Sequence, residues 1–329
     1  MTAKTKPVII PEYLENNRYV RDITRLLERL TYRGRRCYEI FDDWLGVCYH
    51  ALRMMPAHMR HIAEHGTPAP DDDEAAAHWE RLRGLYERQD FGEFQQAFHL
   101  LLGSAEQLPE VGDVLGDVYM AFAYPNSDRG QFFTPWHICQ LMAELIGPNE
   151  RDVFDGLKAA ITTGDTIEHI LAQSALLAGL GCQTPDEAQV WFVQRVAPLA
   201  FACGYEPLTV SDPACGSGRM FVACAANLPA WMTQGAYVQF YGQDIDHTCV
   251  MMAQTNMMLY GLNGHALRWQ AALAGMKIPA ASAQPVVEVA MAAPEMPAAP
   301  RPQPAATIPA APTVRQRQTG GALQLSLFD

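Results

Sequence analysis

The residues with the clearest capacity for chemistry form one short stretch, Asp212-Pro213-Ala214-Cys215-Gly216-Ser217-Gly218. The β-branched run 209–211 leads into it, and residues 219–226 follow with the pattern of a helix. A strand, a glycine turn and a helix in this order are typical of a nucleotide-type cofactor site. The glycines allow close approach of a ligand, and the helix start offers it N–H groups. A Gly-x-Gly turn alone predicts a cofactor site and a plain strand-to-helix connection equally well.

A second acid, Asp244, ends the strand-like run 237–243. An acid after the second strand of such a fold accepts hydrogen bonds from both ribose hydroxyls of a cofactor. Ile245 follows and is placed to pack on an adenine ring, while Asp246 is expected to cap the helix 247–260. A short third strand is predicted over residues 266–269.

The string Asp212–Gly218 resembles motif I of adenine-N6 DNA methyltransferases, most closely that of the modification subunits of type I restriction systems. In that family this turn binds S-adenosylmethionine. The resemblance therefore implies cofactor contacts at the turn and after the second strand. The residues concerned are Asp212, Ala214, Cys215, Gly216, Gly218, Asp244 and Ile245.

An upstream segment extends the resemblance. Residues 130–135, Gly-Gln-Phe-Phe-Thr-Pro, are similar to motif X, which precedes motif I in this subclass, and residues 111–122 look like the helix that leads into the site. Phe132 and Phe133 offer aromatic faces to the cofactor's sulfonium, and Thr134 can hydrogen-bond its amino-acid part. The alternative is a buried aromatic pair that caps the helix 136–146, but the order of the two motifs favours a cofactor site.

The family's catalytic tetrapeptide, Asn or Asp followed by Pro-Pro and an aromatic residue, is missing, since the sequence contains no Pro-Pro pair. In the family this tetrapeptide binds the target amino group and stacks on the flipped base. No residue is therefore assigned to catalysis, and we predict a chain that does not methylate DNA alone. A tetrapeptide supplied by another chain would restore the reaction, with DNA bound indirectly or together with a partner subunit.

The predicted fold class is α/β, a partial Rossmann-like methyltransferase domain of about three parallel strands preceded by an all-α domain. We place the helical domain at 1–110 and the methyltransferase-like domain at 111–275, with a helical insertion at 147–206. A sheet of this extent leaves a buried strand as an exposed edge. The inserted helices, a second copy in a homo-oligomer, or a partner chain are the alternatives that would cover this edge.

The composition changes after Gly275. Residues 276–323 are rich in Ala and Pro and predict an extended, disordered linker. The last residues, 324–329, resemble the peptide by which bacterial replication proteins bind the sliding clamp. The resemblance implies a rim hydrogen bond from Gln324 and groove contacts from Leu325, Leu327 and Phe328, whereas the alternative is a chance match in a tail.

The net charge of −12 is unusual for a protein that binds DNA alone, because neutralisation of phosphates drives such binding. Residues 1–66 are mildly basic, with 11 Lys or Arg against 8 Asp or Glu. Within them Arg33, Arg35 and Arg36 are candidate phosphate contacts, although a solvated turn between helices is the favoured interpretation. The acidic run 71–74 suggests metal binding or, more simply, the charged start of a helix.

The eight cysteines are scattered and form no Cys-x-x-Cys pair, which argues against a zinc site and a disulfide framework. We predict no metal. No apolar run reaches the length of a membrane span, and no signal-peptide core follows the N-terminus, so we expect a soluble cytoplasmic protein.

Two functions remain open. The first is an S-adenosylmethionine-binding protein of the adenine-N6 methyltransferase family. The second is a non-catalytic accessory protein, such as a plasmid, phage or other mobile element would encode, recruited to the sliding clamp by its C-terminal peptide. The missing tetrapeptide separates them, because it favours the second for activity in isolation.

Overall fold

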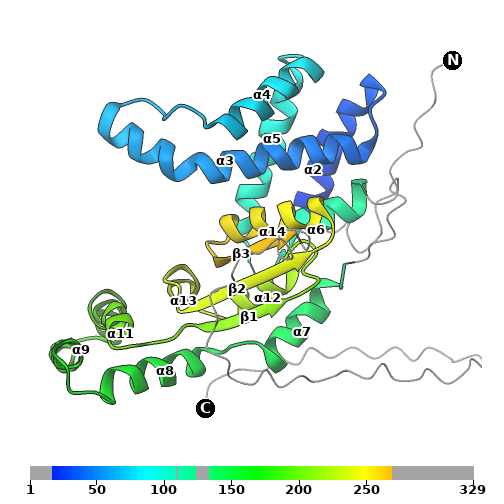
Figure 1. Cartoon of the computed structure of the whole chain (residues 1–329). Coiled ribbons are helices and arrows are strands. Elements are labelled where there is room, and N and C mark those ends of the chain that lie inside the picture. Colours follow the sequence, from blue (N-terminus) through cyan, green and yellow to red (C-terminus); the bar gives the residue numbers. More distant parts are fainter. Residues whose placement is uncertain (1–16, 109, 124–132, 269–329) are drawn as a thin grey trace, which may run out of the picture. The chain divides into compact units, whose positions relative to one another are not determined.

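The computed structural model describes residues 17–108, 110–123 and 133–268 (Figure 1). The chain divides into two units, 1–277 and 278–329, and all described residues belong to the first unit. Phe132, Trp269, the linker 276–323 and the peptide Gln324–Asp329 lie outside the described residues, so the interpretations placed on them stay predictions, as do the domain boundaries.

The N-terminal region is helical, as predicted. Its elements are α2 (Arg18–Glu28), the 3₁₀ segment η1 (Arg29–Arg33), α3 (Cys37–His65), α4 (Asp73–Leu85) and α5 (Asp90–Ala105). Gly34 ends η1 in a left-handed conformation, φ +72°, which a residue with a Cβ atom adopts rarely. The large side chains Phe41, Trp44 and Phe94 are fully buried where α2, α3 and α5 pack together.

The acidic run 71–74 is the start of a helix. Asp72 is the N-cap of α4, and its side chain accepts a hydrogen bond from the Ala75 N–H at 2.9 Å. Over the described ranges, no group of three or more His, Cys, Asp or Glu side chains is placed to hold a metal ion. The simpler interpretation of this run is therefore confirmed.

The segment predicted as one helix over 111–122 is shorter and divided. Gly112 has φ +72° and Asp113 caps the helix, so α6 covers Val114–Val118 and a π-helical turn, η2, covers Tyr119–Ala123. Four apolar residues of this segment are fully buried: Val114, Leu115, Val118 and Phe122.

Three parallel strands form the sheet in the order β1-β2-β3. They are β1 (Leu208–Asp212), β2 (Val238–Asp244) and β3 (Asn263–Arg268), with Asp212 paired to Gly242 and Asp244 paired to Arg268. The third strand begins three residues earlier than predicted, because Asn263 already pairs with Gln239 of β2. The α/β fold class is confirmed.

Helices connect and cover these strands. Between β1 and β2 lie α12 (Arg219–Ala226) and α13 (Ala230–Gln234), and between β2 and β3 lies α14 (His247–Leu259). Asp246 caps α14, as predicted, by accepting from the Thr248 N–H at 2.8 Å. α14 packs on β2 and β3 with one side and on α3 with another, so the N-terminal helices rest on the sheet through it (Figure 1).

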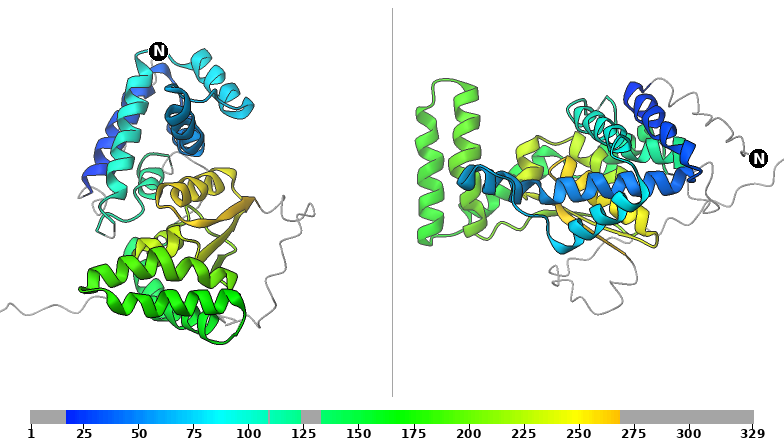
Figure 2. Two further views of the ribbon diagram at one scale, coloured as in Figure 1. Left: turned by 90° about the vertical axis from the view of Figure 1, so that its left-hand side faces the viewer. Right: turned by 90° about the horizontal axis from the view of Figure 1, so that it is seen from above.

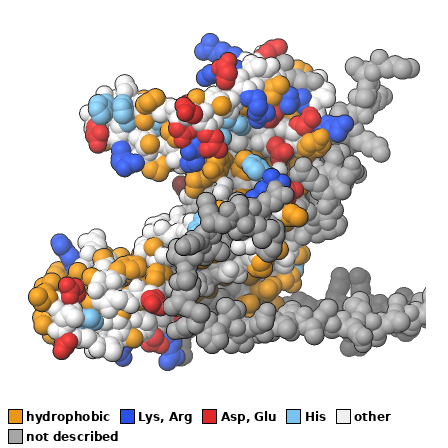
Figure 3. Space-filling view, in the orientation of Figure 1, with side chains coloured by type: hydrophobic (Ala, Val, Ile, Leu, Met, Phe, Trp, Pro, Cys, Tyr) orange, Lys and Arg blue, Asp and Glu red, His pale blue; other side chains and the backbone are white. Residues whose placement is uncertain are grey.

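The insertion before β1 is helical, as predicted. The segment that follows α7 (Trp136–Ile146) comprises α8 (Glu150–Thr162), α9 (Ile167–Ala178), the 3₁₀ turn η4 (Gly179–Gly181), α10 (Pro185–Trp191), the π-helical turn η5 (Phe192–Val196) and α11 (Ala197–Ala202). These helices pack on one another and lie side by side in Figure 2. Figure 3 shows apolar side chains gathered on their surface, where Leu171, Leu177 and Leu180 are exposed. None of the described helices is both long and apolar enough to cross a membrane.

The two edge strands of the described sheet are β1 and β3. Among the described strands β1 pairs only with β2, and its residues Thr209 and Ser211 are exposed. β2 lies in the middle, and Val238 and Phe240 on it are fully buried. The strand that carries the glycine turn is therefore an edge strand in the described part of the chain, as β3 is.

Candidate cofactor site

The glycine turn connects β1 to α12 in a tight, buried path. Gly216 has φ +54° and Gly218 has φ +76°, both in the left-handed region that favours glycine. A Cβ atom on Gly218 would lie 3.3 Å from the Cα of Ala253 on α14, so the turn packs directly against that helix. The two glycines thus set the path of the chain between strand and helix.

Four N–H groups of the turn already have acceptors within the chain. Those of Ala214 and Gly216 donate to carboxylates, to Asp212 Oδ1 and Asp244 Oδ2 respectively, both at 2.9 Å. Those of Cys215 and Gly218 donate to carbonyl oxygens at 2.9 and 2.8 Å. These four N–H groups of the turn are therefore already paired, and the helix start that is expected to offer N–H groups to a ligand begins after them, at Arg219.

Asp212 and Asp244 end neighbouring strands, and both face the turn. Asp244 Oδ1 also accepts from the Asp246 N–H at 2.9 Å. Burial raises the pKa of Asp212, the charge of Asp244 raises it further, and the hydrogen bond from Ala214 opposes the change. A carboxylate has about four lone-pair positions, so both groups retain capacity to accept hydroxyl donors.

Phe133 lies on the glycine turn, although the two are far apart in the sequence. A Cβ atom added to Gly216 would lie 3.0 Å from the Phe133 ring. The ring stacks on Tyr119 with centroids 5.4 Å apart, and the guanidinium carbon of Arg219 lies 5.9 Å from its centre. Neighbours therefore hold this ring beside the turn. Thr134 is exposed next to it.

Ile245 is 74% exposed and directly follows Asp244. An exposed isoleucine beside an acid offers an apolar surface next to a hydrogen-bond acceptor, as the adenosine half of a cofactor requires. Cys215 is buried behind the turn, where burial first and the charges of Asp212 and Asp244 next raise its pKa to about 12. A thiol with a pKa raised in this way is protonated at neutral pH.

Sequence reasoning missed a buried polar network beneath the turn. Asp113 is fully buried, and its Oδ2 accepts from Ser217 Oγ at 2.5 Å and from Arg219 Nε at 3.1 Å. Its Oδ1 accepts from the Gly116 N–H and from Asn256 Nδ2, both at 2.9 Å. One carboxylate thus joins α6, the glycine turn, α12 and α14.

Arg219 extends this network to the motif X segment. Its Nη2 donates to Asp117 Oδ1 at 2.5 Å, and its Nη1 donates to the Thr134 carbonyl at 3.2 Å. The cluster holds two acids and one guanidinium, so one carboxylate has no cation of its own. Burial, together with the charge of Asp113, raises the pKa of Asp117 to about 6 against the opposing effect of Arg219.

The sequence carried a signal for this cluster. Asp113 and Asp117 stand four residues apart in an otherwise apolar helix, and Arg219 is one of two basic residues in 206–275. Ionisable groups in such surroundings are almost never buried without a partner. The sequence could have suggested that Arg219 pairs with these two acids, but not that Ser217 and Asn256 complete the network.

Comparison with known proteins finds a family whose matched region includes the glycine turn. Residues 162–296 match the family model of N-6 DNA methylases, a range that includes β1, the glycine turn, β2 and Asp244. The match confirms over these residues the resemblance to adenine-N6 DNA methyltransferases. It does not extend to Phe133 and Thr134. No curated protein matches this chain.

Proposed function

Since residues 162–296 match the N-6 DNA methylases, we propose that this chain binds S-adenosylmethionine between the glycine turn 212–218 and Asp244. Proteins of that family generally use this compound as methyl donor. The observation that carries the proposal is the meeting of Asp244 with the turn through the Gly216 N–H, at the carboxyl ends of two parallel strands. Ligands of open α/β sheets bind at this end of the strands.

The residue types around the turn suit each part of that cofactor. Asp244 would accept the ribose hydroxyls, and exposed Ile245 would pack on the adenine ring. Phe133, with Phe132 and Thr134, would hold the methionine end. When bound, S-adenosylmethionine supplies an electrophilic methyl group. The chain's own residues bind and orient it.

We further propose that methylation of adenine in DNA requires a second polypeptide. The sequence has no Pro-Pro pair, so the tetrapeptide that holds the target base must come from elsewhere. The unpaired edge of β1 is a suitable place for a partner's strand. α7, which packs on α12, adds an apolar surface on which Leu145 is 73% and Ile146 76% exposed.

Calorimetric titration of the full chain with S-adenosylmethionine tests the binding proposal. We expect saturable binding, and weaker binding of ATP, which shares the adenosine but lacks the methionine part. Absence of binding would refute the proposal. In a separate assay the purified chain should transfer no labelled methyl group to adenine-containing DNA, and transfer by the chain alone would refute the requirement for a partner.

A second candidate function rests on the C-terminal peptide. The sequence Gln324-Leu325-Ser326-Leu327-Phe328 resembles sliding-clamp-binding peptides, and a linker of the length 276–323 would give it reach. In this alternative the chain is a non-catalytic accessory protein brought to the replication clamp. The two functions are compatible, because the peptide lies outside the residues proposed to bind the cofactor.

A further inference from the structure

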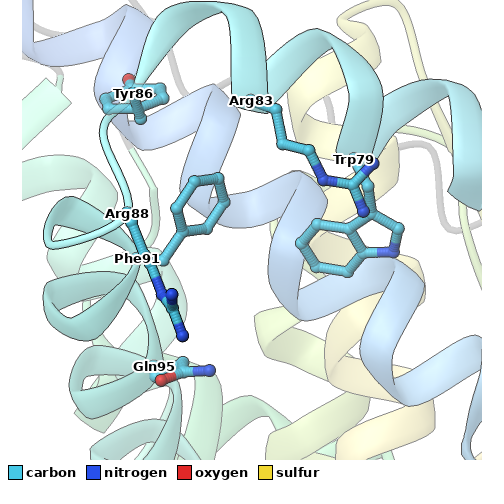
Figure 4. Close-up of a pocket in the computed structure, with 6 residues that line it drawn as sticks. All are labelled: Trp79, Arg83, Tyr86, Arg88, Phe91 and Gln95. Carbon is cyan, nitrogen blue, oxygen red and sulfur yellow. The ribbon is translucent and has the colours of Figure 1, made fainter.

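The N-terminal helices contain an open groove that the cofactor site does not use. It lies between α4 and the start of α5 and has a volume of about 500 Å³. Figure 4 shows Trp79 and Arg83 extending from α4 on one side, with Arg88 and Phe91 on the other. Its lining residues are Trp79, Arg83, Tyr86, Arg88, Phe91 and Gln95.

The lining combines three aromatic rings with two guanidinium groups and no carboxylate. Trp79 and Phe91 are half-buried, so part of each ring is accessible. Tyr86 is buried, and its hydroxyl donates to Asp43 at 2.7 Å, which leaves only its ring to the groove.

The polar groups of the groove are available to a ligand. Arg88 and Gln95 are exposed, and their side chains have no hydrogen bond or ion pair to any residue that the structure describes. Arg83 forms an ion pair with Glu80, at 3.0 Å, and this exposed pair is of small energetic value.

Two carboxylates near the groove form ion pairs with arginines. Asp43 pairs with Arg35 at 3.3 Å and with Arg81 at 2.7 Å. Glu93, near the start of α5, pairs with Arg29 at 3.2 Å. The lining of the groove itself therefore holds two guanidinium groups and no carboxylate, although Glu87 and Asp90 stand on either side of Arg88 and Gln89 in the sequence.

A second hollow borders the first. It has a volume of about 360 Å³ and shares the Trp79 side chain as part of its wall. Its other lining residues are His50, Ala51, Met55, His58, Met59 and Asp71. Because one indole separates two hollows, a ligand with several planar rings along a chain fits this surface better than a single ring does.

We propose that this groove binds an unpaired stretch of single-stranded DNA. A base would stack on Trp79 and Phe91, a phosphate would contact Arg83 and Arg88, and Gln95 would meet a base edge. Stacking on aromatic side chains together with cationic contacts to the backbone is how proteins hold single strands without duplex structure. Asp71 disfavours a phosphate in the second hollow, so the phosphate contacts are expected on the arginine side. The site is independent of S-adenosylmethionine.

Fluorescence anisotropy of a labelled oligothymidylate of about 12 nucleotides, titrated with the full chain at several salt concentrations, tests the proposal. We expect tighter binding of this strand than of the duplex with its complement or of free thymidine monophosphate. Trp79→Ala should weaken binding about tenfold, the effect of one lost stacking contact. Arg88→Gln should lower the slope of log affinity against log salt by about 0.7, because one phosphate contact is lost.

The controls are exposed arginines outside the groove. Arg60→Gln on α3 and Arg151→Gln on α8 should leave both affinity and salt slope unchanged. Circular dichroism shows whether Trp79→Ala folds. If it does not, Phe91→Leu is the substitute variant, because it retains apolar packing but loses an aromatic ring, and it should also weaken binding. Equal affinity for the duplex or the mononucleotide, or equal effects of Arg88→Gln and Arg60→Gln, would overturn the proposal.

Discussion

Arg219 Nε lies 3.1 Å from Asp113 Oδ2, and this buried pair joins residues 106 positions apart in the sequence. Asp113 is the N-cap of α6, and Arg219 is the first residue of α12 after the glycine turn. The same guanidinium reaches Asp117 and the Thr134 carbonyl. The pair therefore fixes the position of the turn relative to the segment that carries Phe133.

Removal of the guanidinium should destabilise the fold strongly. Arg219→Met leaves the Asp113 carboxylate buried without a cation, which costs about 3–5 kcal/mol of unfolding free energy. The exposed pair of Arg151 with Asp155 on α8 is the matched control, and Arg151→Met should cost about 0.5 kcal/mol or less. Urea unfolding measures both, and similar losses in the two variants would show that the buried pair has no special role.

The raised pKa of Asp117 should make the unfolding free energy depend on pH. Its pKa is about 6 in the folded protein against an ordinary value of 3.8, so the folded state holds a proton in this window that the unfolded chain has released. The contribution of this group to the unfolding free energy therefore falls as pH rises from about 4 to 6 and is constant above.

Asp117→Asn removes this titration and keeps an oxygen that accepts from Arg219. The difference in unfolding free energy, wild type minus variant, should fall as pH rises through that window. Urea unfolding at a series of pH values measures it. A difference that rises with pH, or that stays constant, would contradict the assignment.

The glycine turn should tolerate substitution less well than another left-handed glycine. Gly218 and Gly34 have φ of +76° and +72°, but a Cβ atom would meet Ala253 at 3.3 Å in the first and nothing within 4 Å in the second. Gly34→Ala should cost about 1 kcal/mol from backbone strain alone, and Gly218→Ala about 2 kcal/mol. Thermal unfolding compares the two, and a larger loss for Gly34→Ala would mean that the turn does not pack on α14 as described.

Local sequence patterns predicted that the three strands, the glycine turn and the Asp246 cap exist, because a few adjacent residues determine each of these. They were insufficient for the start of β3, which depends on pairing with Gln239 in another strand. They also missed the start of α6, which the left-handed Gly112 displaces. The bonds of Asp113 to Ser217, Arg219 and Asn256 link segments more than 100 residues apart, and no periodicity records such contacts.

The C-terminal peptide predicts binding to the bacterial sliding clamp. Purified clamp should be retained by the immobilised full chain and lost on deletion of Gln324–Asp329, because Leu327 and Phe328 would no longer fill the clamp's apolar groove. A variant in which Leu327 and Phe328 are both replaced by Ala is the finer test. If the chain that lacks Gln324–Asp329 still retains the clamp, the proposed accessory function loses its basis.

The central claim is that the turn and Asp244 together hold S-adenosylmethionine, and calorimetry on two variants tests it most directly. Asp244→Ala removes the acceptor for the ribose hydroxyls and should raise Kd about tenfold or more, as expected for lost hydrogen bonds to a charged group. Asp246→Ser, two residues away, keeps the N-cap of α14 and should bind as the wild type does. Wild-type affinity in Asp244→Ala, or equal losses in both variants, would contradict the account.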